Sequence, residues 1–251
     1  ERAREIAQGS ITVARNEGGV LPLRSEDPLR LLQLVSPSLP IGAFTYSQGL
    51  EWAVEIGWVR DLESLKDWLG GLMDDSLALL ELPILARLYR AVEERDPQRL
   101  RHWGERLYAS RETRELRLEE RNRARALTTL LIDLGVGQAA DWRAELALCQ
   151  ATPHALASVR WGIALEDSAL GYAWGWLENQ VAAAVKLIPL GQTDGQRVLL
   201  QLAGRLPGVC ATTSTSAATC ACPCRWSIRP YATAVASVLR SARSRSPTIS
   251  R

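Results

Sequence analysis

The sequence predicts an all-α protein, a single compact bundle of about eight to ten helices. From about residue 31 to about residue 207, apolar residues recur at three- and four-residue steps, which places them on one face of a helix. No segment alternates apolar and polar residues for long enough to indicate a strand. Hydrophobic residues make up 47% of the 251 residues and charged residues 23%, a profile typical of soluble globular proteins.

Start and stop signals divide this region into elements. A first short helix at 31–35 is expected to end before Pro37, whose ring disfavours helical geometry at the residue that precedes it. Asp61 and Asp96 are expected to cap helices, and Pro83 to kink one. Later helices are expected from residue 48 onward, and then over 62–73, 74–92, 97–108, 110–134, 142–149, 152–166, 168–188 and 194–206.

Two prolines and two glycines interrupt the otherwise apolar segment 31–51. Phe44 and Tyr46 fall on a bend too rich in Pro and Gly for an ordinary helix, and helical spacing resumes at Gln48. A core helix needs no such interruptions. We therefore expect the bent segment to shape a specific surface or a dimer contact.

The chain divides into three parts. Residues 1–29 are expected to be a poorly ordered lead-in, 30–207 an all-helical domain, and 208–251 an atypical tail without Asp or Glu that is expected to be disordered. The tail contains a Cys-x-Cys-x-Cys run, but its one-residue spacing and the lack of a nearby histidine are poor signals for a zinc site (Cys220, Cys222 and Cys224). No metal site is therefore predicted.

Composition and motifs argue against several functions. The net charge of +2 is too small to indicate binding to nucleic acid or to an anionic membrane. No long uncharged apolar run indicates a membrane span, and the first residues lack the apolar region of a signal peptide, so a cytoplasmic location is expected. No Gly-rich loop matches an NTP-binding motif, and neither His102 nor His154 has a recognisable catalytic partner. We predict no catalytic residue and no cofactor.

Four collinear segments between about residue 31 and about residue 207 resemble the UreF family of urease accessory proteins. They are LLQLVSPSLPIGAFTYSQGLE at 31–51, SRETRELRLEER at 110–121, WGIALEDSA at 161–169 and YAWGWLENQVAAAVKLIPLGQTDG at 172–195. The first and last of these are the most distinctive.

The resemblance implies a non-enzymatic, all-helical adaptor that dimerises. It implies assembly with UreD (also called UreH) and with the GTPase UreG, for nickel insertion into the urease apoprotein. By position, it implies a bend at the partner or dimer surface formed by Pro37, Pro40, Gly42, Phe44, Tyr46, Ser47 and Glu51. It also places a polar edge facing a partner at Gln180, Lys186, Gly191 and Gln192.

The tail departs from the family pattern, which ends in an acidic, then apolar, then Arg/His-containing segment. We interpret residues 208–251 as the product of a frameshift in the underlying DNA, with a genuine tail as the alternative. In the family this segment contributes to partner contact, so the departure puts partner recruitment by this copy in doubt.

Three alternatives stay open. The charged residues 111–125 suit either a solvated helix with intrahelical ion pairs or a face that binds a partner. The apolar helix at 172–188 suits either a central core helix with one wet edge or a contact with a second subunit. For the function, two hypotheses stand beside the adaptor. One is a helical enzyme whose site includes Glu178 and Lys186, which lie two turns apart on one helix, and the other is a helical interaction protein unrelated to urease.

Overall fold

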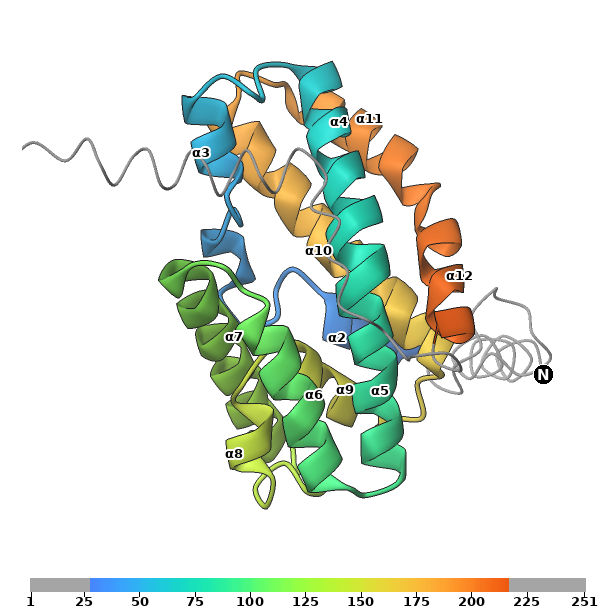
Figure 1. Ribbon diagram of the computed structural model, residues 1–251. Helices are drawn as coiled ribbons and strands as arrows, with labels where there is room; N and C mark the ends of the chain where they lie inside the picture. The colour runs from blue at the N-terminus through green and yellow to red at the C-terminus, as the bar shows by residue number, and fades with distance from the viewer. Residues whose placement is uncertain (1–27, 217–251) are drawn as a thin grey trace, which may run out of the picture. The chain divides into compact units, whose positions relative to one another are not determined.

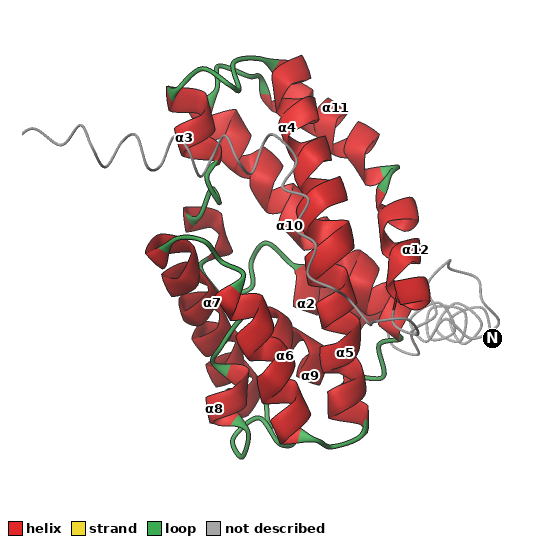
Figure 2. Ribbon diagram, viewed as in Figure 1, coloured by secondary structure: helices red, strands yellow, loops and turns green. Residues whose placement is uncertain are grey.

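The computed structural model describes residues 28–216, and within this range it contains helices and no strand (Figures 1 and 2). The all-α prediction is confirmed. None of the helices in the described range is long and apolar enough to cross a membrane. The elements are α2 (Pro28–Val35), the 3₁₀ turn η1 (Ala43–Thr45), α3 (Leu50–Glu55), α4 (Leu62–Leu72), the π-helical η2 (Met73–Glu81), α5 (Leu82–Glu93), α6 (Pro97–Ala109), α7 (Arg114–Asp133), α8 (Arg143–Leu146), α9 (Ala151–Arg160), α10 (Leu165–Leu187), α11 (Gln192–Ala203) and α12 (Leu206–Ser216).

The two predicted aspartate caps are confirmed. Asp61 accepts a hydrogen bond from the backbone N–H of Ser64 at 2.9 Å, and Ser64 Oγ accepts one from the N–H of Asp61 at 3.1 Å, which completes a capping box. Asp96 accepts from the N–H of Arg99 at 2.9 Å, and Pro97 occupies the first turn of α6. Both caps satisfy backbone donors that have no partner inside the helix.

Helix α7 begins at Arg114, later than the predicted start at Ser110. The hydroxyl of Ser110 instead donates to the carbonyl of Leu107 at the end of α6, and Thr113 caps α7 by accepting from a backbone N–H of its first turn. Gly135 follows the end of the helix, with a left-handed φ of 71° that favours glycine. Helices α8 and α9 are shorter than predicted, since α8 ends at Leu146 and α9 at Arg160.

The long run from Leu62 to Glu93 changes helix type in its middle. Met73–Glu81 is π-helical, and Pro83 lies in the first turn of the α-helix that follows. Proline has no N–H, so it cannot bond the carbonyl four residues earlier, and the chain accommodates this with a wider turn. The predicted disturbance at Pro83 therefore takes the form of a π-helical segment, which carries Glu81 toward the interior.

Helix α10 lies at the centre of the bundle (Figure 1). It packs against α2, α3, α4, α5, α9, α11 and α12. Glycines allow the closest approaches: a Cβ on Gly171 would lie 2.7 Å from Leu31 Cδ1 and 2.8 Å from Val35 Cγ1, and one on Gly195 of α11 would lie 2.6 Å from Val185 Cγ2. The structure thus supports the first of the two alternatives for this helix, a central core helix.

The predicted division into lead-in, domain and tail stays a prediction, because most of the lead-in and of the tail lies outside the described residues. The lead-in at 1–29 lies outside the described residues except for the first residues of α2. At the other end, α12 continues through Pro207 to Ser216, so residues 208–216, predicted to belong to the tail, are helical. The remaining tail residues, with the Cys-x-Cys-x-Cys run, lie outside the described range.

Two glycines of α10 give a matched test of this packing. We expect Gly175→Ala to stabilise the protein by about 0.5–1 kcal/mol, because alanine favours the helix and a Cβ there meets only a carbonyl oxygen at 3.9 Å. Gly171→Ala gains the same helix propensity but pushes against α2, so it should be less stable than Gly175→Ala by about 1–3 kcal/mol. Urea unfolding of both variants measures the difference, and equal stabilities would contradict the close α2–α10 packing.

Candidate functional site

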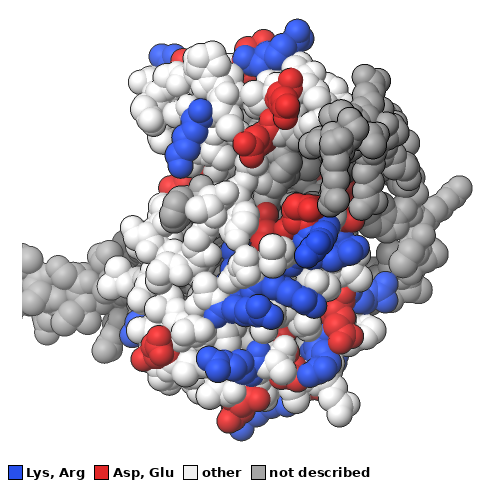
Figure 3. All heavy atoms as spheres, turned by 90° about the vertical axis from the view of Figure 1, so that its left-hand side faces the viewer, with Lys and Arg blue, Asp and Glu red and all other residues white. Residues whose placement is uncertain are grey.

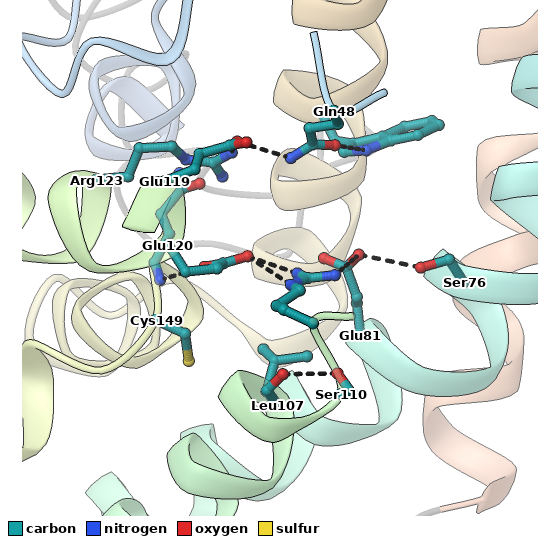
Figure 4. A network of polar contacts seen from close by, with 12 residues as sticks. Gln48, Ser76, Glu81, Leu107, Ser110, Glu119, Glu120, Arg123 and Cys149 are labelled. Atoms are coloured by element: carbon teal, nitrogen blue, oxygen red, sulfur yellow. Dashed lines mark hydrogen bonds and ion pairs between the residues drawn. The ribbon is translucent and has the colours of Figure 1, made fainter. Parts of the chain in front are cut away.

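An ion-pair network lies inside the protein at the meeting of η2, α7 and α10 (Figure 4). Arg111, in the loop before α7, donates from Nη1 to Glu81 Oε1 at 3.1 Å and from Nη2 to Glu120 Oε1 at 2.5 Å. Tyr172 of α10 donates to the other oxygen of Glu81 at 3.1 Å. One guanidinium group thereby joins the π-helical segment to α7, and the phenol adds α10.

Glu120 is held from a further side. Its Oε2 accepts from the backbone N–H of Gln150, just before α9, at 3.0 Å, and its exposed fraction is only 2%. Burial alone would raise the pKa of Glu120, but the charges of Arg111 and Arg123 outweigh burial and lower it. The carboxylate therefore stays ionised inside the protein, which a buried charge does only when it is paired.

A second ion pair lies one residue away on α7. Arg123 Nη1 donates to Glu119 Oε1 at 2.6 Å, and both side chains are buried. This is an intrahelical pair at i and i+4, which the sequence predicted, but it is buried rather than solvated. Glu119 and Glu120 are neighbours in sequence and hold different partners, so α7 presents two separate acceptors to the interior.

Gln48 connects this network to the bent N-terminal segment. Its Nε2 donates to Glu119 Oε1 at 3.1 Å, and its Oε1 accepts from Trp176 Nε1 at 2.8 Å and from Gln180 Nε2 at 3.2 Å. A carboxylate only accepts and an indole only donates, so the orientation of the Gln48 amide is fixed from both ends. The backbone of Gln48 has a φ of 51°, which a non-glycine residue rarely adopts.

Tyr46 is held by two more contacts. Asn179 of α10 donates to its backbone carbonyl at 3.1 Å, and Asn122 of α7 donates to its hydroxyl at 3.2 Å. The bent segment is therefore attached to α7 on one side and to α10 on the other. The left-handed φ of Gly42 (70°) and of Gly49 (92°) turns the chain at the two ends of the bend.

The other predicted residues of the bend lie on or near the surface. Pro37, Pro40 and Glu51 are exposed, and Gly42 and Ser47 are half-buried. Ser47 Oγ accepts from the backbone N–H of Glu51 at 3.4 Å at the start of α3. The structure therefore brings the predicted residues of 37–51 together as one surface feature; of Phe44 only the backbone, in η1, is described.

The predicted polar edge at the end of α10 requires a correction. Gln180 does not lie at an edge, because it is fully buried and bonded to Gln48. Lys186, Gly191 and Gln192 are exposed. Glu178 is half-buried, and burial raises the pKa of its carboxyl group. The side-chain N–H groups of Asn179 and Gln180 donate within this chain, to the Tyr46 carbonyl and to Gln48, whereas Gln180 Oε1 is buried without a hydrogen-bond partner among the described residues.

The sequence analysis missed the network itself. Glu81, Arg111, Glu120 and Arg123 come from segments that are separated by up to about forty residues, and charged residues on helices usually face water. One signal was present: Glu120 stands at helical spacing from Ala124, Leu127 and Leu131, so it falls on the apolar stripe of its helix.

His154, set aside above as a catalytic candidate, lies deep in α9. Its Nε2 lies 3.2 Å from the carbonyl oxygen of Ser168, and its ring meets that of Tyr172 edge to face at 5.2 Å between centroids. Burial lowers its pKa to about 4. The ring is therefore neutral near pH 7 and packs in the core.

Fold and network together describe a helical scaffold in which buried charges position a loop at the surface. Comparisons with known proteins agree with this class and specify it. A family model described as UreF matches residues 59–203. This chain is 53% identical to the urease accessory protein UreF of Alcanivorax borkumensis over an alignment of 186 residues, which covers 72% of this chain and 81% of the relative.

Two further relatives carry the same name. The UreF protein of Pseudomonas putida is 52% identical over 181 residues, which cover 72% of this chain and 81% of the relative. That of Escherichia coli O157:H7 is 47% identical over 180 residues, with coverage of 72% and 80%. The chain belongs to the UreF family of urease accessory proteins, and the hypothesis of an unrelated helical interaction protein is thereby excluded.

Removing the central cation tests the network. We expect Arg111→Ala to destabilise the protein by about 3–5 kcal/mol, because Glu81 and Glu120 would be left buried without their main cation. The control is Arg114→Ala, an exposed arginine in the first turn of α7, which should change stability by no more than about 0.5 kcal/mol. Urea denaturation measures both, and a similar small effect for the two variants would show that the network adds little.

Buried His154 predicts a dependence of stability on pH. Its folded pKa of about 4 lies below its usual value of 6.5, so protonation favours the unfolded state. The free energy of unfolding should therefore fall by roughly 2–4 kcal/mol as the pH drops from about 6.5 to about 4. In His154→Gln this fall in the free energy of unfolding should be much smaller, whereas His102→Gln, at an exposed histidine, should show it in full. Urea unfolding at several pH values measures the fall, and an equal fall in His154→Gln and wild type would contradict the prediction.

Proposed function

We propose that the chain is a non-enzymatic adaptor that assembles with UreD/UreH and the GTPase UreG and takes part in nickel insertion into the urease apoprotein. Membership of the UreF family supports an accessory role in urease maturation. In this proposal the nickel ion is cargo of the assembly, and this chain contributes binding surfaces. A homodimer and a cytoplasmic location belong to the same proposal.

The observation that carries the proposal is the clamped bend. Tyr46 and Gln48 are fixed to α7 and α10 by hydrogen bonds, while Pro37, Pro40 and Glu51 of the same segment are exposed. A loop held in one conformation binds a partner without a large ordering cost. We infer that this segment, with Phe44 in it, contacts a partner or the second subunit.

The exposed end of the α10–α11 turn provides a second element of the proposal. Lys186, Gly191 and Gln192 are exposed there, and we infer that they face a partner. Gln180 takes part only indirectly, since it supports Gln48 from the interior. The alternative of an enzyme site at Glu178 and Lys186 gains no support from the half-buried carboxyl group alone.

Co-purification tests the proposal. The chain is co-expressed with UreD/UreH, UreG and the urease apoprotein, and complexes are resolved by size-exclusion chromatography with mass detection. We expect Tyr46→Asp to abolish the complex or the dimer and to leave the helical circular dichroism unchanged, because Tyr46 lies outside the helices and its backbone contact with Asn179 does not depend on the side chain. Tyr46→Phe, which keeps the ring, should bind nearly as well as wild type.

Wild-type complexes formed by Tyr46→Asp would show that the bend has only a structural role. A parallel arm uses the tail as given and the tail restored to the alternate reading frame. Complex formation only with the restored tail would support the frameshift interpretation, and complex formation with neither would count against the adaptor function.

A further inference from the structure

Helix α7 has acidic residues both inside the protein and at its exposed ends. In its middle, Glu119 and Glu120 are buried and paired inside the protein, while Glu115 and Asp133 near its two ends are exposed. Arg117, Arg121 and Arg125 follow one another at four-residue steps, which places them along one side of the helix; Arg121 and Arg125 are exposed and Arg117 is half-buried. We call these three residues the arginine row. No acidic side chain between residues 117 and 129 faces outward with them.

None of the three arginines has a carboxylate within ion-pair distance among residues 28–216. Arg121 lies over the ring of Tyr108 at 4.6 Å from its centroid, which orients it and leaves its charge uncompensated. The space-filling view toward α7 shows Lys and Arg over the lower half of this face, with several Asp and Glu among them (Figure 3). The arginine row itself is basic, because none of its guanidinium groups is paired with a carboxylate in the part of the chain that the structure describes.

Apolar groups adjoin the arginine row. Leu118, between two of the arginines in sequence, is 55% exposed. A shallow open groove of about 370 Å³ lies between the C-terminal half of α7 and Pro40 of the bend. Ala126 and Leu130 contribute to its lining beside Arg125, and Asp133 lines its far end. Exposed leucine and proline beside arginine is a combination typical of protein interfaces, where arginine is enriched and lysine is not.

The arginine row is also continuous with the bend. Asn122, one residue after Arg121, donates to the hydroxyl of Tyr46, and Arg125 lies across the groove from Pro40. The two segments that the sequence analysis treated separately, the charged helix and the bend, therefore form one surface. Its position is set by the buried contacts of Glu119 and Gln48.

We propose that the arginine row, Leu118 and the groove at Pro40 form a docking surface for an acidic segment of a protein partner, one that carries carboxylates along one side and an apolar side chain for the groove. The proposal rests on the proposed adaptor function and specifies one of its surfaces. Charge complementarity is its basis, since three uncompensated guanidinium groups favour carboxylates. A protein partner is favoured over nucleic acid because the surface includes apolar groups and the chain carries a net charge of only +2.

The test compares two charge reversals of equal size. Arg121→Glu with Arg125→Glu reverses two charges of the arginine row. Arg60→Glu with Arg95→Glu reverses two exposed arginines in loops elsewhere on the protein. The probes are the co-expressed UreD/UreH, UreG and urease apoprotein, and each full-length variant is titrated against them from about 0.05 M to about 0.5 M NaCl, a range over which exposed charges become screened.

We expect the reversal in the arginine row to weaken one of these associations by roughly tenfold or more at low salt, because like charges would then face each other. The weakening of that association by salt should be lost or reversed, because salt would then screen a repulsion. The control pair should bind as wild type does. Arg121→Lys with Arg125→Lys should retain most of the affinity. Arg125→Glu alone serves as a second variant, because it leaves the contact between Arg121 and Tyr108 intact.

If wild type forms complexes and the variant with the reversed arginine row binds with the same affinity and salt dependence, the docking surface is overturned and the adaptor function is not. The docking surface is overturned together with the adaptor function if the wild-type chain captures none of the probes. Association that disappears after nuclease treatment would assign the basic surface to nucleic acid and would also overturn it. Unchanged circular dichroism of each variant confirms that binding, and not folding, was altered.

Discussion

Arg111 joins two carboxylates that belong to different helices, and the arrangement of the bundle around it depends on this contact. Glu81 ends the π-helical segment, and Glu120 lies on α7. Taking two carboxylates and a guanidinium out of water is costly, and the cost is offset only when geometry satisfies all of them. Here Ser76, Tyr172 and the backbone of Gln150 supply the remaining donors. These hydrogen bonds and ion pairs form together in only one relative placement of η2, α7 and α10, whereas apolar side chains alone could pack in several.

That constraint extends to the surface through one residue. Because Glu120 must face Arg111, its neighbour Glu119 is turned toward the bend, where it accepts from Gln48. The carboxylate, the indole of Trp176 and the amide of Gln180 together fix Gln48 in a backbone conformation that is unfavourable for most side chains. The position of Tyr46 follows, since it is two residues away and is bonded to both α7 and α10. A surface loop is thus ordered by charges in the core.

The sequence predicted the helices well because their signals are local. Caps at Asp61 and Asp96 and the end of α7 at Gly135 depend on residues within one turn, and apolar spacing depends on residues within two. The boundaries that failed are also instructive: Ser110 looked like a helix start, but its hydroxyl closes the preceding helix. The prolines and glycines of residues 31–51 located the bend, but the sequence did not reveal its contacts.

The site was predictable only in part, because its partners meet in three dimensions. Gln180 resembled a polar residue at a free edge, since no local feature reveals that Gln48 lies against it. The π-helical turn that carries Glu81 inward follows from Pro83, but its partner Arg111 lies in a distant loop. Buried charge can be suspected from sequence where an acid falls on an apolar stripe, as Glu120 does. The identity of the partner requires the fold.

Helix α7 carries the buried acids on one side and the arginine row on another. The inward acids hold the bend, and the outward arginines take no part in that network, so changes on the outer face leave the inner contacts in place. A surface of this kind can adapt to a partner without loss of the scaffold. Because the bend and the helix are already attached at Tyr46, a partner that contacts both meets a preorganised surface, and less of the binding free energy is lost in ordering it. The buried ion pairs therefore order the surface that the proposed partner would contact, although that partner would contact none of them.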